Sequence, residues 1–366
     1  MATTIITDFD SIYLTSHLPE EVEISTEAAR LEIRIYVGGF KVFTSIYYPF
    51  NETVIIRDIR DIVEAAMLKR EQSLASLKIE VYEPTIVVPT DGYTYDENGN
   101  IIINYNATTA DHTPVATAEN IKMVFSSFKT QQEIASFLQS SFLTTRKSAL
   151  VPKNGSVMLS FYTKANAQGT NFARIFYSPV GSPETVMTYD YTLSSTQATT
   201  ERIMTASLRH GAYYSVIYSR MGIQSIIRGV EYHIGSRQFN VFFTDEQASD
   251  VFTFRNAFNV EETVYLFGAT TVKTEVDHSE AMCGRVTQFY DETVKVKHEV
   301  ETAPLPYDEA LWLNQMLTSK CVTHTLDDGT DARILISDIS SEVTDSSKEL
   351  IRLKFSWKYA DGNEWI

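Results

Sequence analysis

The clearest fold signal lies in residues 251–357, whose central part reads RVTQFYDETVKVKHEVETAPLPYDEALWLNQML from Arg285 to Leu317. Hydrophobic periodicity over 285–359 changes from about two residues to about 3.6 and back to about two. This change predicts two strands, at 285–290 and 293–300, then one helix and three closing strands. The residues upstream have the pattern of several β-rich modules that precede this unit.

Two prolines locate the predicted helix. Pro304 and Pro306 precede residues 307–317, and proline is tolerated in the first turn of a helix. The core stripe is expected at Ala310, Leu313 and Leu317, widened by Trp312 and Met316. The closing strands are expected at 321–326, 333–343 and 350–359, with Leu353, Phe355 and Trp357 on one face.

The composition supports a β-rich chain of several domains. With 366 residues the chain is too long for one ordinary core, so two to four domains are expected. Aromatic residues reach 12%, with 20 Tyr and 20 Phe, a set that fits pleated sheet surfaces. We therefore predict a mainly β (α+β) fold of several small β-sandwich or barrel-like modules, each flanked by one short helix.

The chain divides into four predicted segments. Residues 1–82 form an N-terminal module that begins with an arm or edge strand, Met1 to Ala28, and continues as a β-β-β-α-β unit over 31–82. Its helix follows Asp58, a potential cap. Residues 83–114 form a protruding hairpin or linker, 115–250 a middle β-rich domain, and 251–366 a C-terminal β-α-β module. In the middle domain we expect a helix after Thr130 and Glu133, a capping box, and strands that include 213–219 and 230–243.

The protruding segment has two interpretations. Asn98-Gly99 lies between Tyr93 and Tyr95 on one side and an isoleucine run on the other, a pattern typical of a hairpin tip. Asp96, Asn98 and Gly99 also match part of a calcium-binding loop. Tyr105 stands where such a loop needs a bidentate glutamate, so the hairpin is favoured.

Charge and cysteine content exclude several classes of protein. A formal charge of −16, with no cluster of basic residues, argues against direct nucleic-acid binding. No run of residues reaches the length of a membrane span. The two cysteines, Cys283 and Cys321, are too few for a disulfide framework, so we expect reduced, partly buried thiols in a chain assembled in a cytoplasm.

No pattern points to a catalyst, so we expect no enzyme, cofactor or metal site. Common phosphate-binding, hydrolase and zinc motifs are missing from the sequence, and the seven histidines lack metal spacing. Cys283 and His298 are a conceivable nucleophile and base, but two residues without a local motif are more often structural. Asp190, which alternates with tyrosines, fits a solvent-facing strand position better than a catalyst.

Several segments resemble a family of poorly characterised phage and prophage proteins from gut bacteria. The segments are Phe254-Arg255-Asn256-Ala257-Phe258-Asn259, Glu299 to Leu305, Tyr307 to Ala310, Ile336-Ser337-Asp338, Leu353 to Trp357, Tyr48-Pro49-Phe50, Ile56 to Ile59, Leu74 to Leu77, Phe142 to Thr145 and Leu159 to Phe161. The resemblance implies a virion component of the tail or baseplate, and it brings no catalytic residues with it.

Three functions follow as hypotheses. The first is a distal-tail-like structural protein of the tail tip or baseplate, which forms a ring or trimer with itself and contacts other virion proteins. Its expected assembly contacts are Ile86, Val87, Val88, Tyr93, Tyr95, Asn98, Phe254 and Phe258. The second is a receptor- or glycan-binding tail module that uses the tyrosine-rich middle domain. The third is a polysaccharide-cleaving tail enzyme.

Overall fold

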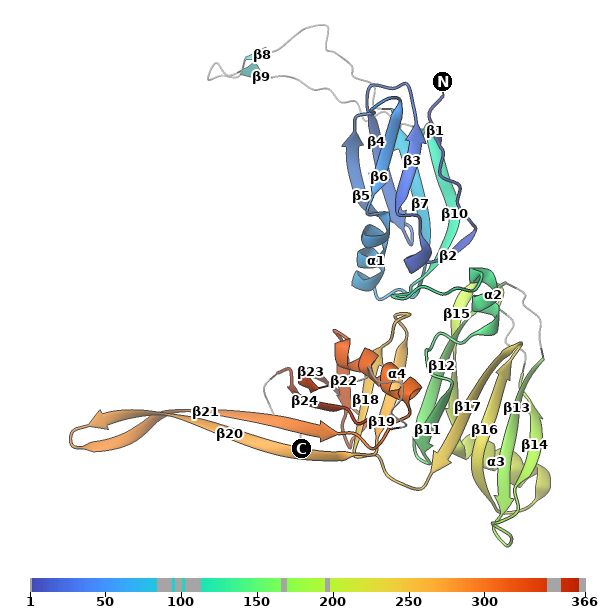
Figure 1. Ribbon diagram of the computed structural model, residues 1–366, viewed down its shortest axis with the longest axis vertical. Coiled ribbons are helices and arrows are strands. Elements are labelled where there is room, and N and C mark those ends of the chain that lie inside the picture. Colours follow the sequence, from blue (N-terminus) through green and yellow to red (C-terminus); the bar gives the residue numbers. More distant parts are fainter. Residues whose placement is uncertain are drawn as a thin grey trace. The chain divides into compact units, whose positions relative to one another are not determined.

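The computed structural model describes residues 2–83, 94–95, 101–102, 113–165, 170–194, 198–340 and 350–361. The chain folds as two compact units, Met1–Ile134 and Ala135–Ile366. Both consist mainly of β-strands in separate sheets, with a few short helices (Figure 1). The predicted fold class is therefore confirmed.

The first unit contains two sheets with a shared core. One sheet has the strand order β1-β3-β6 and the other β2-β10-β7-β4-β5, and the pair β2–β10 is parallel while the other pairs are antiparallel. The elements are β1 (Thr4–Ile5), β2 (Ile12–Leu14), the 3-10 helix η1 (Thr15–His17), β3 (Glu21–Ser25), β4 (Leu31–Val37), β5 (Phe40–Tyr47), β6 (Thr53–Arg57), α1 (Ile59–Lys69), β7 (Leu74–Tyr82) and β10 (Ala116–Val124).

Period-two alternation builds this core. In β4 the residues alternate strictly between buried and half-buried, as expected for a strand with one face inside. Helix α1 buries Ile59, Val63 and Met67 against the same core. Asp58 occupies the N-cap position with a φ of 59°, and its side chain makes no capping hydrogen bond in the described chain. Apolar burial, rather than a side-chain cap, therefore fixes this helix.

The predicted arm or edge strand and one predicted boundary can be compared with the structure. The segment Met1 to Ala28 supplies the edge strand β1, and also β3, which lies between β1 and β6 and buries Val22 and Ile24 completely, so it is not a free arm. Strand β10 pairs with β7, so the first unit continues beyond residue 114 to Ile134. Within 83–114 the structure describes one antiparallel pair, β8 (Thr94–Tyr95) with β9 (Ile101–Ile102), as expected for the hairpin. Asn98-Gly99 and Asp96 lie outside the described residues.

The second unit begins with a middle module of two sheets. A five-stranded sheet has the order β11-β17-β16-β13-β14, and β12 pairs with β15. The elements are α2 (Ile134–Ser140), β11 (Ser148–Pro152), β12 (Ser156–Thr163), β13 (Asn171–Pro179), β14 (Met187–Thr192), β15 (Arg202–Arg209), α3 (His210–Met221), β16 (Ser225–Ile234) and β17 (Arg237–Thr244).

Helix α3 replaces a predicted strand at 213–219. The run is rich in Tyr, Val and Ile, which favour strands, yet Tyr213 and Ile217 are one helical turn apart and both are buried. Gly222 ends the helix with a φ of 65°, a conformation that glycine adopts without steric cost. The predicted strand 230–243 is also divided, since β16 and β17 form a hairpin that turns at Gly235.

The C-terminal module is a seven-stranded sheet covered by one helix. Its strand order is β19-β18-β22-β23-β24-β21-β20, and every neighbouring pair is antiparallel. The elements are β18 (Asp250–Arg255), β19 (Glu261–Leu266), β20 (Ala269–Cys283), β21 (Val286–Glu301), α4 (Tyr307–Thr318), β22 (Val322–Thr325), β23 (Asp331–Ser340) and β24 (Lys354–Tyr359).

The predicted helix is confirmed as α4, with Pro306 at its N-cap. It buries Ala310, Leu313 and Leu317, and also Trp312 and Met316. Leu353, Phe355 and Trp357 are buried in the same core, which confirms that they share a face. The two strands predicted at 285–290 and 293–300 are instead one continuous strand, β21.

One contact fixes the middle module against the C-terminal sheet. The hydroxyl of Tyr265 in β19 accepts a hydrogen bond from the Ser156 amide at 2.8 Å and donates one to the Ser156 carbonyl at 2.9 Å. A Cβ atom at Gly155 would lie 2.8 Å from this phenol ring, so only glycine permits the approach.

Candidate functional site

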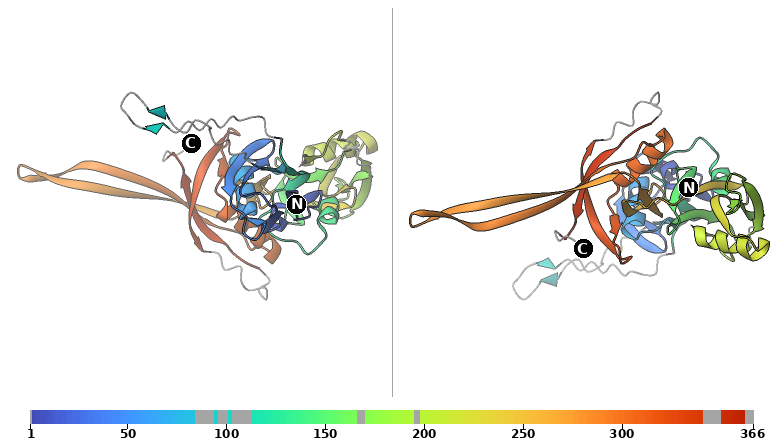
Figure 2. Two further views of the ribbon diagram at one scale, coloured as in Figure 1. Left: turned by 90° about the horizontal axis from the view of Figure 1, so that it is seen from above. Right: turned by 90° about the horizontal axis from the view of Figure 1, so that it is seen from below.

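Strands β20 and β21 form a long hairpin that projects from the C-terminal sheet (Figure 1). They pair from Ala269–Glu301 at the base to Cys283–Val286 at the tip. The turn consists of Gly284 and Arg285, and Gly284 has a φ of 68°. One bulge interrupts the register near Ser279, where β21 has an extra residue. Both further views show the ribbon extending away from the other strands of its module (Figure 2).

One face of this hairpin is apolar and exposed. Residues directly opposite each other in a ladder share a face, and Val276 is opposite Val294. His278 and Phe289 lie on the same face, with ring centroids 4.4 Å apart. The apolar face, as we use the term below, consists of Val272, Val276, Met282, Phe289 and Val294, which are 57%, 42%, 77%, 62% and 51% exposed. Glu280, which is opposite Phe289, also lies on this face. Exposed apolar side chains gathered on one face are a feature of interaction sites.

The opposite face of the hairpin is charged. Lys295 Nζ lies 2.8 Å from Asp277 Oδ2, and Lys273 Nζ lies 2.7 Å from Glu299 Oε2. The hydrogen bond from Lys295 lowers the pKa of Asp277, and the same bond raises the pKa of Lys295. The hairpin therefore has one charged face and one largely apolar face.

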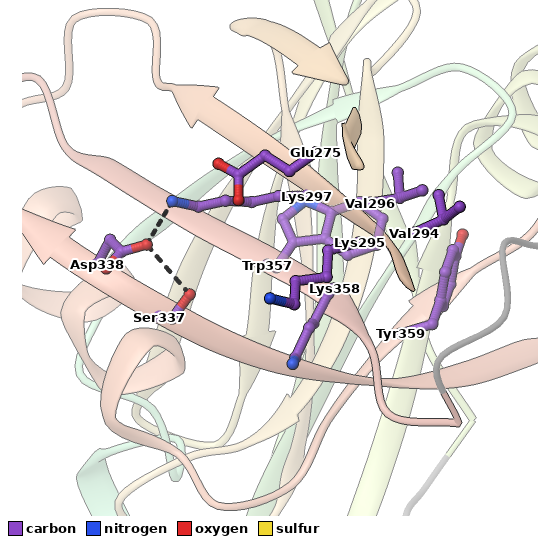
Figure 3. Close-up of a pocket in the computed structure, with 10 residues that line it drawn as sticks. All are labelled: Glu275, Val294, Lys295, Val296, Lys297, Ser337, Asp338, Trp357, Lys358 and Tyr359. Carbon is purple, nitrogen blue, oxygen red and sulfur yellow. Dashed lines mark hydrogen bonds and ion pairs between the residues drawn. The ribbon is translucent and has the colours of Figure 1, made fainter. Parts of the chain in front are cut away.

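A cavity of about 320 Å³ lies where the hairpin leaves the sheet (Figure 3). In the described chain, β21 pairs with β24 only from Glu301–Lys354 to His298–Trp357. Past Trp357, β24 continues beside β23. We call the diverging part of β21 and β24 the fork, and residues of β20, β21, β23 and β24 line its cavity.

Charged and apolar residues line different parts of the fork. Lys297 Nζ lies 2.6 Å from Asp338 Oδ2, and this hydrogen bond raises the pKa of Lys297 and lowers that of Asp338. Figure 3 shows Lys295 and Lys358 directed to one side of the cavity, with Val294 and Val296 at another part of its wall. Such a site suits a ligand with both apolar and acidic groups.

The floor of the fork is a buried aromatic cluster. The Trp357 side chain is buried, and its Nε1 has no hydrogen-bond partner in the described part of the chain. His324 Nδ1 lies 3.0 Å from the Tyr359 hydroxyl, and Asp250 Oδ1 lies 3.6 Å from His324 Nε2. Burial lowers the pKa of His324, and Asp250 opposes this effect. The cluster therefore favours a neutral imidazole.

A second cavity, of about 240 Å³, lies between the middle and C-terminal modules. It is lined by Arg146, which is only 8% exposed, and by Trp312 and Glu309 of α4. The Arg146 guanidinium lies 4.0 Å from the Trp312 ring centroid, and its Nε lies 3.7 Å from Glu262 Oε2. Burial lowers the pKa of Arg146 and raises that of Glu309.

Glu262 organises the buried polar groups around this cavity. One carboxylate oxygen accepts a hydrogen bond from Asn256 Nδ2 at 2.5 Å, and the other accepts one from Trp312 Nε1. Asn256 Nδ2 also donates to the Leu143 carbonyl at 2.8 Å. The arrangement joins the segment after α2 to β19 and α4, which is what a structural junction requires.

Two of the predicted assembly contacts, Phe254 and Phe258, are 1% and 0% exposed, so both belong to the interior of the described chain. Phe254 packs on Trp312 and Phe258 stacks on Phe137. Tyr95 lies in β8. Ile86, Val87, Val88, Tyr93 and Asn98 lie outside the described residues.

The structure also shows where the residues considered for catalysis lie. Cys283 is at the hairpin tip, whereas His298 is opposite Val272 at the base, and the intervening residues of β20 separate them by about 35 Å at ~3.3 Å per residue. They cannot act as a pair. Both cysteines are free and exposed, not partly buried as expected. Asp190 is solvent-facing and forms a bidentate ion pair with Arg174, at 2.8 and 3.0 Å.

Sequence reasoning missed the hairpin as one element. The signal was present, because Gly284 separates two runs in which Val272, Val276, Val294 and Val296 alternate with charged or polar residues. A short loop with glycine between alternating runs is a hairpin pattern. The exposed state of the apolar face could not be predicted, since alternation looks the same whether that face is covered or open.

Comparisons with known proteins give no family. No family model matches the chain, and no curated protein matches it. It is similar to a solved structure titled "Crystal structure of calcium binding domain CBD12 of CALX1.1", with a TM-score of 0.18 and 7% identity over 64% of this chain and 81% of that chain. The described residues contain no group of three or more His, Cys, Asp or Glu that could hold a metal ion. None of the described helices is long and apolar enough to cross a membrane.

Proposed function

We propose that this protein is a structural component of a phage virion, in the tail tip or baseplate, and that it assembles into a symmetric oligomer. The observation that carries the proposal is the apolar face of the β20–β21 hairpin. Its five residues are exposed in the single chain, although valine, methionine and phenylalanine gain free energy when they leave water.

The apolar face continues the core of the C-terminal module. Val300 and His298 lie on the same side of β21 as Val294, and both are buried at the base of the hairpin. An isolated two-stranded ribbon is at best marginally stable in water, so a ribbon of this length needs a partner. Symmetric assembly supplies one by placing each apolar face against the next copy.

Two further features support the proposal. Strands β19 and β20 are the edges of the seven-stranded sheet, and assembly is one way to cover a sheet edge. The sequence segments that resemble phage and prophage proteins include parts of β21, α4 and β24 in this module. The virion location rests on that resemblance.

Analytical ultracentrifugation of the full chain tests the assembly. We expect the native protein to sediment as an oligomer, and the double variant Val276→Lys/Val294→Lys to sediment as a monomer, because it places two charges in the centre of the apolar face. Glu275→Lys is the matched control: it changes the net charge equally, on the charged face of the same ribbon. A native chain that stays monomeric at high concentration, without ring-like particles in micrographs, would refute the assembly.

The virion location needs a separate test. Antibodies raised against the purified chain should decorate the tail end of phage particles from a host that carries this sequence. Decoration of heads, or particles that contain none of this chain, would remove the virion assignment and leave the self-assembly result unaffected.

A further inference from the structure

The fork between β21 and β24 exposes two strand edges that face each other. The ladder between these strands ends at His298–Trp357, while β21 continues with β20 and β24 continues with β23. Beyond that point, neither strand has a ladder partner on the fork side among the described residues. Open strand edges carry unpaired N–H and C=O groups, which another extended chain can pair with.

A buried aromatic side chain lies beside the fork. Trp357 is 1% exposed, and its Nε1 is buried without an acceptor in the described chain. Such a donor is unfavourable, because it has lost its hydrogen bonds to water and gained none in return. Trp357 lines the 320 Å³ cavity of the fork, so its indole is a reporter for any group that enters the cavity.

The side chains of the fork define the chemistry of that partner. Val294 and Val296 offer an apolar wall. Lys295 and Lys358 point to one side of the cavity (Figure 3). Lys295 is paired with Asp277 and Glu275 also lines the cavity, whereas no ion pair of Lys358 occurs among the described residues. An entering strand with apolar side chains on one face and carboxylates on the other would match both surfaces, because successive residues of a strand point to opposite faces.

We propose that the fork is the acceptor site for an extended peptide strand of another protein, in which apolar residues alternate with Asp or Glu. The strand adds to the open edge of β21 beside Trp357. Its carboxylates pair with Lys358 and Lys295. The site borders the apolar face and shares Val294 with it.

The indole N–H signal of Trp357 tests the proposal directly. The probe is a short synthetic peptide in which valine and glutamate alternate, added to the full chain labelled with ¹⁵N-tryptophan. The Trp357 signal is assigned by its loss in Trp357→Phe. We expect this signal to move and to saturate, because the bound peptide changes the surroundings of the indole, while the other two tryptophan signals stay in place. A peptide of the same composition with its glutamates and valines in separate blocks should leave the signal unmoved.

Two charge reversals locate the binding site. Lys358→Glu should weaken binding of the alternating peptide about tenfold or more, because attraction becomes repulsion. Lys354→Glu is the matched control, four residues away on the same strand, exposed, and outside the fork. It should change affinity less than about twofold.

Three results would overturn the proposal. The first is an unmoved Trp357 signal at saturating peptide. The second is equal weakening by both charge reversals, which would indicate non-specific attraction. The third is movement of the Trp357 signal with protein concentration alone, which would show that a second copy fills the fork. Retained peptide binding in Val276→Lys, which changes the apolar face and leaves the lining of the fork intact, would show that the fork acts independently of assembly.

Discussion

The imidazole of His298 lies parallel to the indole of Trp357, with 3.8 Å between ring centroids and 9° between ring planes. These two residues form the last pair of the ladder between β21 and β24. The stack therefore lies at the point where the hairpin separates from the sheet. It joins the exposed ribbon to the buried core of the C-terminal module.

Removing this stack should destabilise the module. His298→Ala is expected to lower the free energy of unfolding by about 1–2 kcal/mol, since a buried ring pair contributes beyond its area. Chemical denaturation measures the change. His278→Ala is the matched control, because His278 stacks on Phe289 in the exposed ribbon and its loss should have little effect on unfolding of the monomer. If both variants lost the same free energy of unfolding, the stack at the base of the hairpin would have no special role in stability.

Stability should fall in mild acid because of His324. Burial lowers its pKa, so the unfolded chain binds a proton more readily than the folded chain as pH falls through about 6.5. The contribution is fully present above that pH and is lost progressively below it. His298 acts in the same direction, whereas Asp250, Asp327 and Asp331 oppose it.

Denaturation curves between about pH 7 and about pH 5 measure this effect. His324→Gln keeps a polar group near the Tyr359 hydroxyl and removes the titration. We expect the variant to lose less stability than the native chain over this range. If both curves fall equally, other groups cause the acid sensitivity.

Replacing Glu262 should lower the stability of the protein far more than replacing Glu261. Glu262→Ala leaves Arg146 buried without its ion-pair partner and removes the acceptor of Asn256 and Trp312. Loss of one partner from such a buried pair costs about 3–5 kcal/mol. Glu261→Ala removes an exposed pair with Arg255 and should cost at most about 1 kcal/mol. Thermal unfolding compares the two, and a mild effect of Glu262→Ala would show that the junction is not held by this network.

Two glycine-to-alanine substitutions should change the unfolding temperature in opposite directions. At Gly268 a Cβ atom would lie 2.1 Å from the Glu301 carbonyl oxygen, at the base of the hairpin, so Gly268→Ala must shift the backbone. At Gly211, the second residue of α3, nothing lies within 4 Å, and alanine favours a helix over glycine, by about 1 kcal/mol in a helix interior. Gly268→Ala should therefore unfold at a lower temperature than the native chain and Gly211→Ala at a higher one. A tolerated Gly268→Ala would show that the hairpin base can move.

Sequence pattern predicted the elements whose local signals agree. Helices α1 and α4 have helical periodicity, and Pro306 fixes the start of α4. The alternation of β4 and of Leu353, Phe355 and Trp357 predicted correctly which faces are buried. Helix α3 was missed because its strand-favouring residues conflict with its packing, and Tyr213 and Ile217 are buried only through contacts far along the chain.

The mainly β class, the two clear helices and the residues that can be buried follow from the amino-acid pattern alone, because they depend on the period of the apolar positions. Long-range pairing was needed to show that β10 completes the first unit, that Phe254 and Phe258 are interior, and that the apolar face of the hairpin is open. The same alternation of valines serves a covered strand or an exposed one. Whether the valines are covered depends on the neighbouring strands that the folded chain supplies. The pairing of β21 with β24 ends at His298.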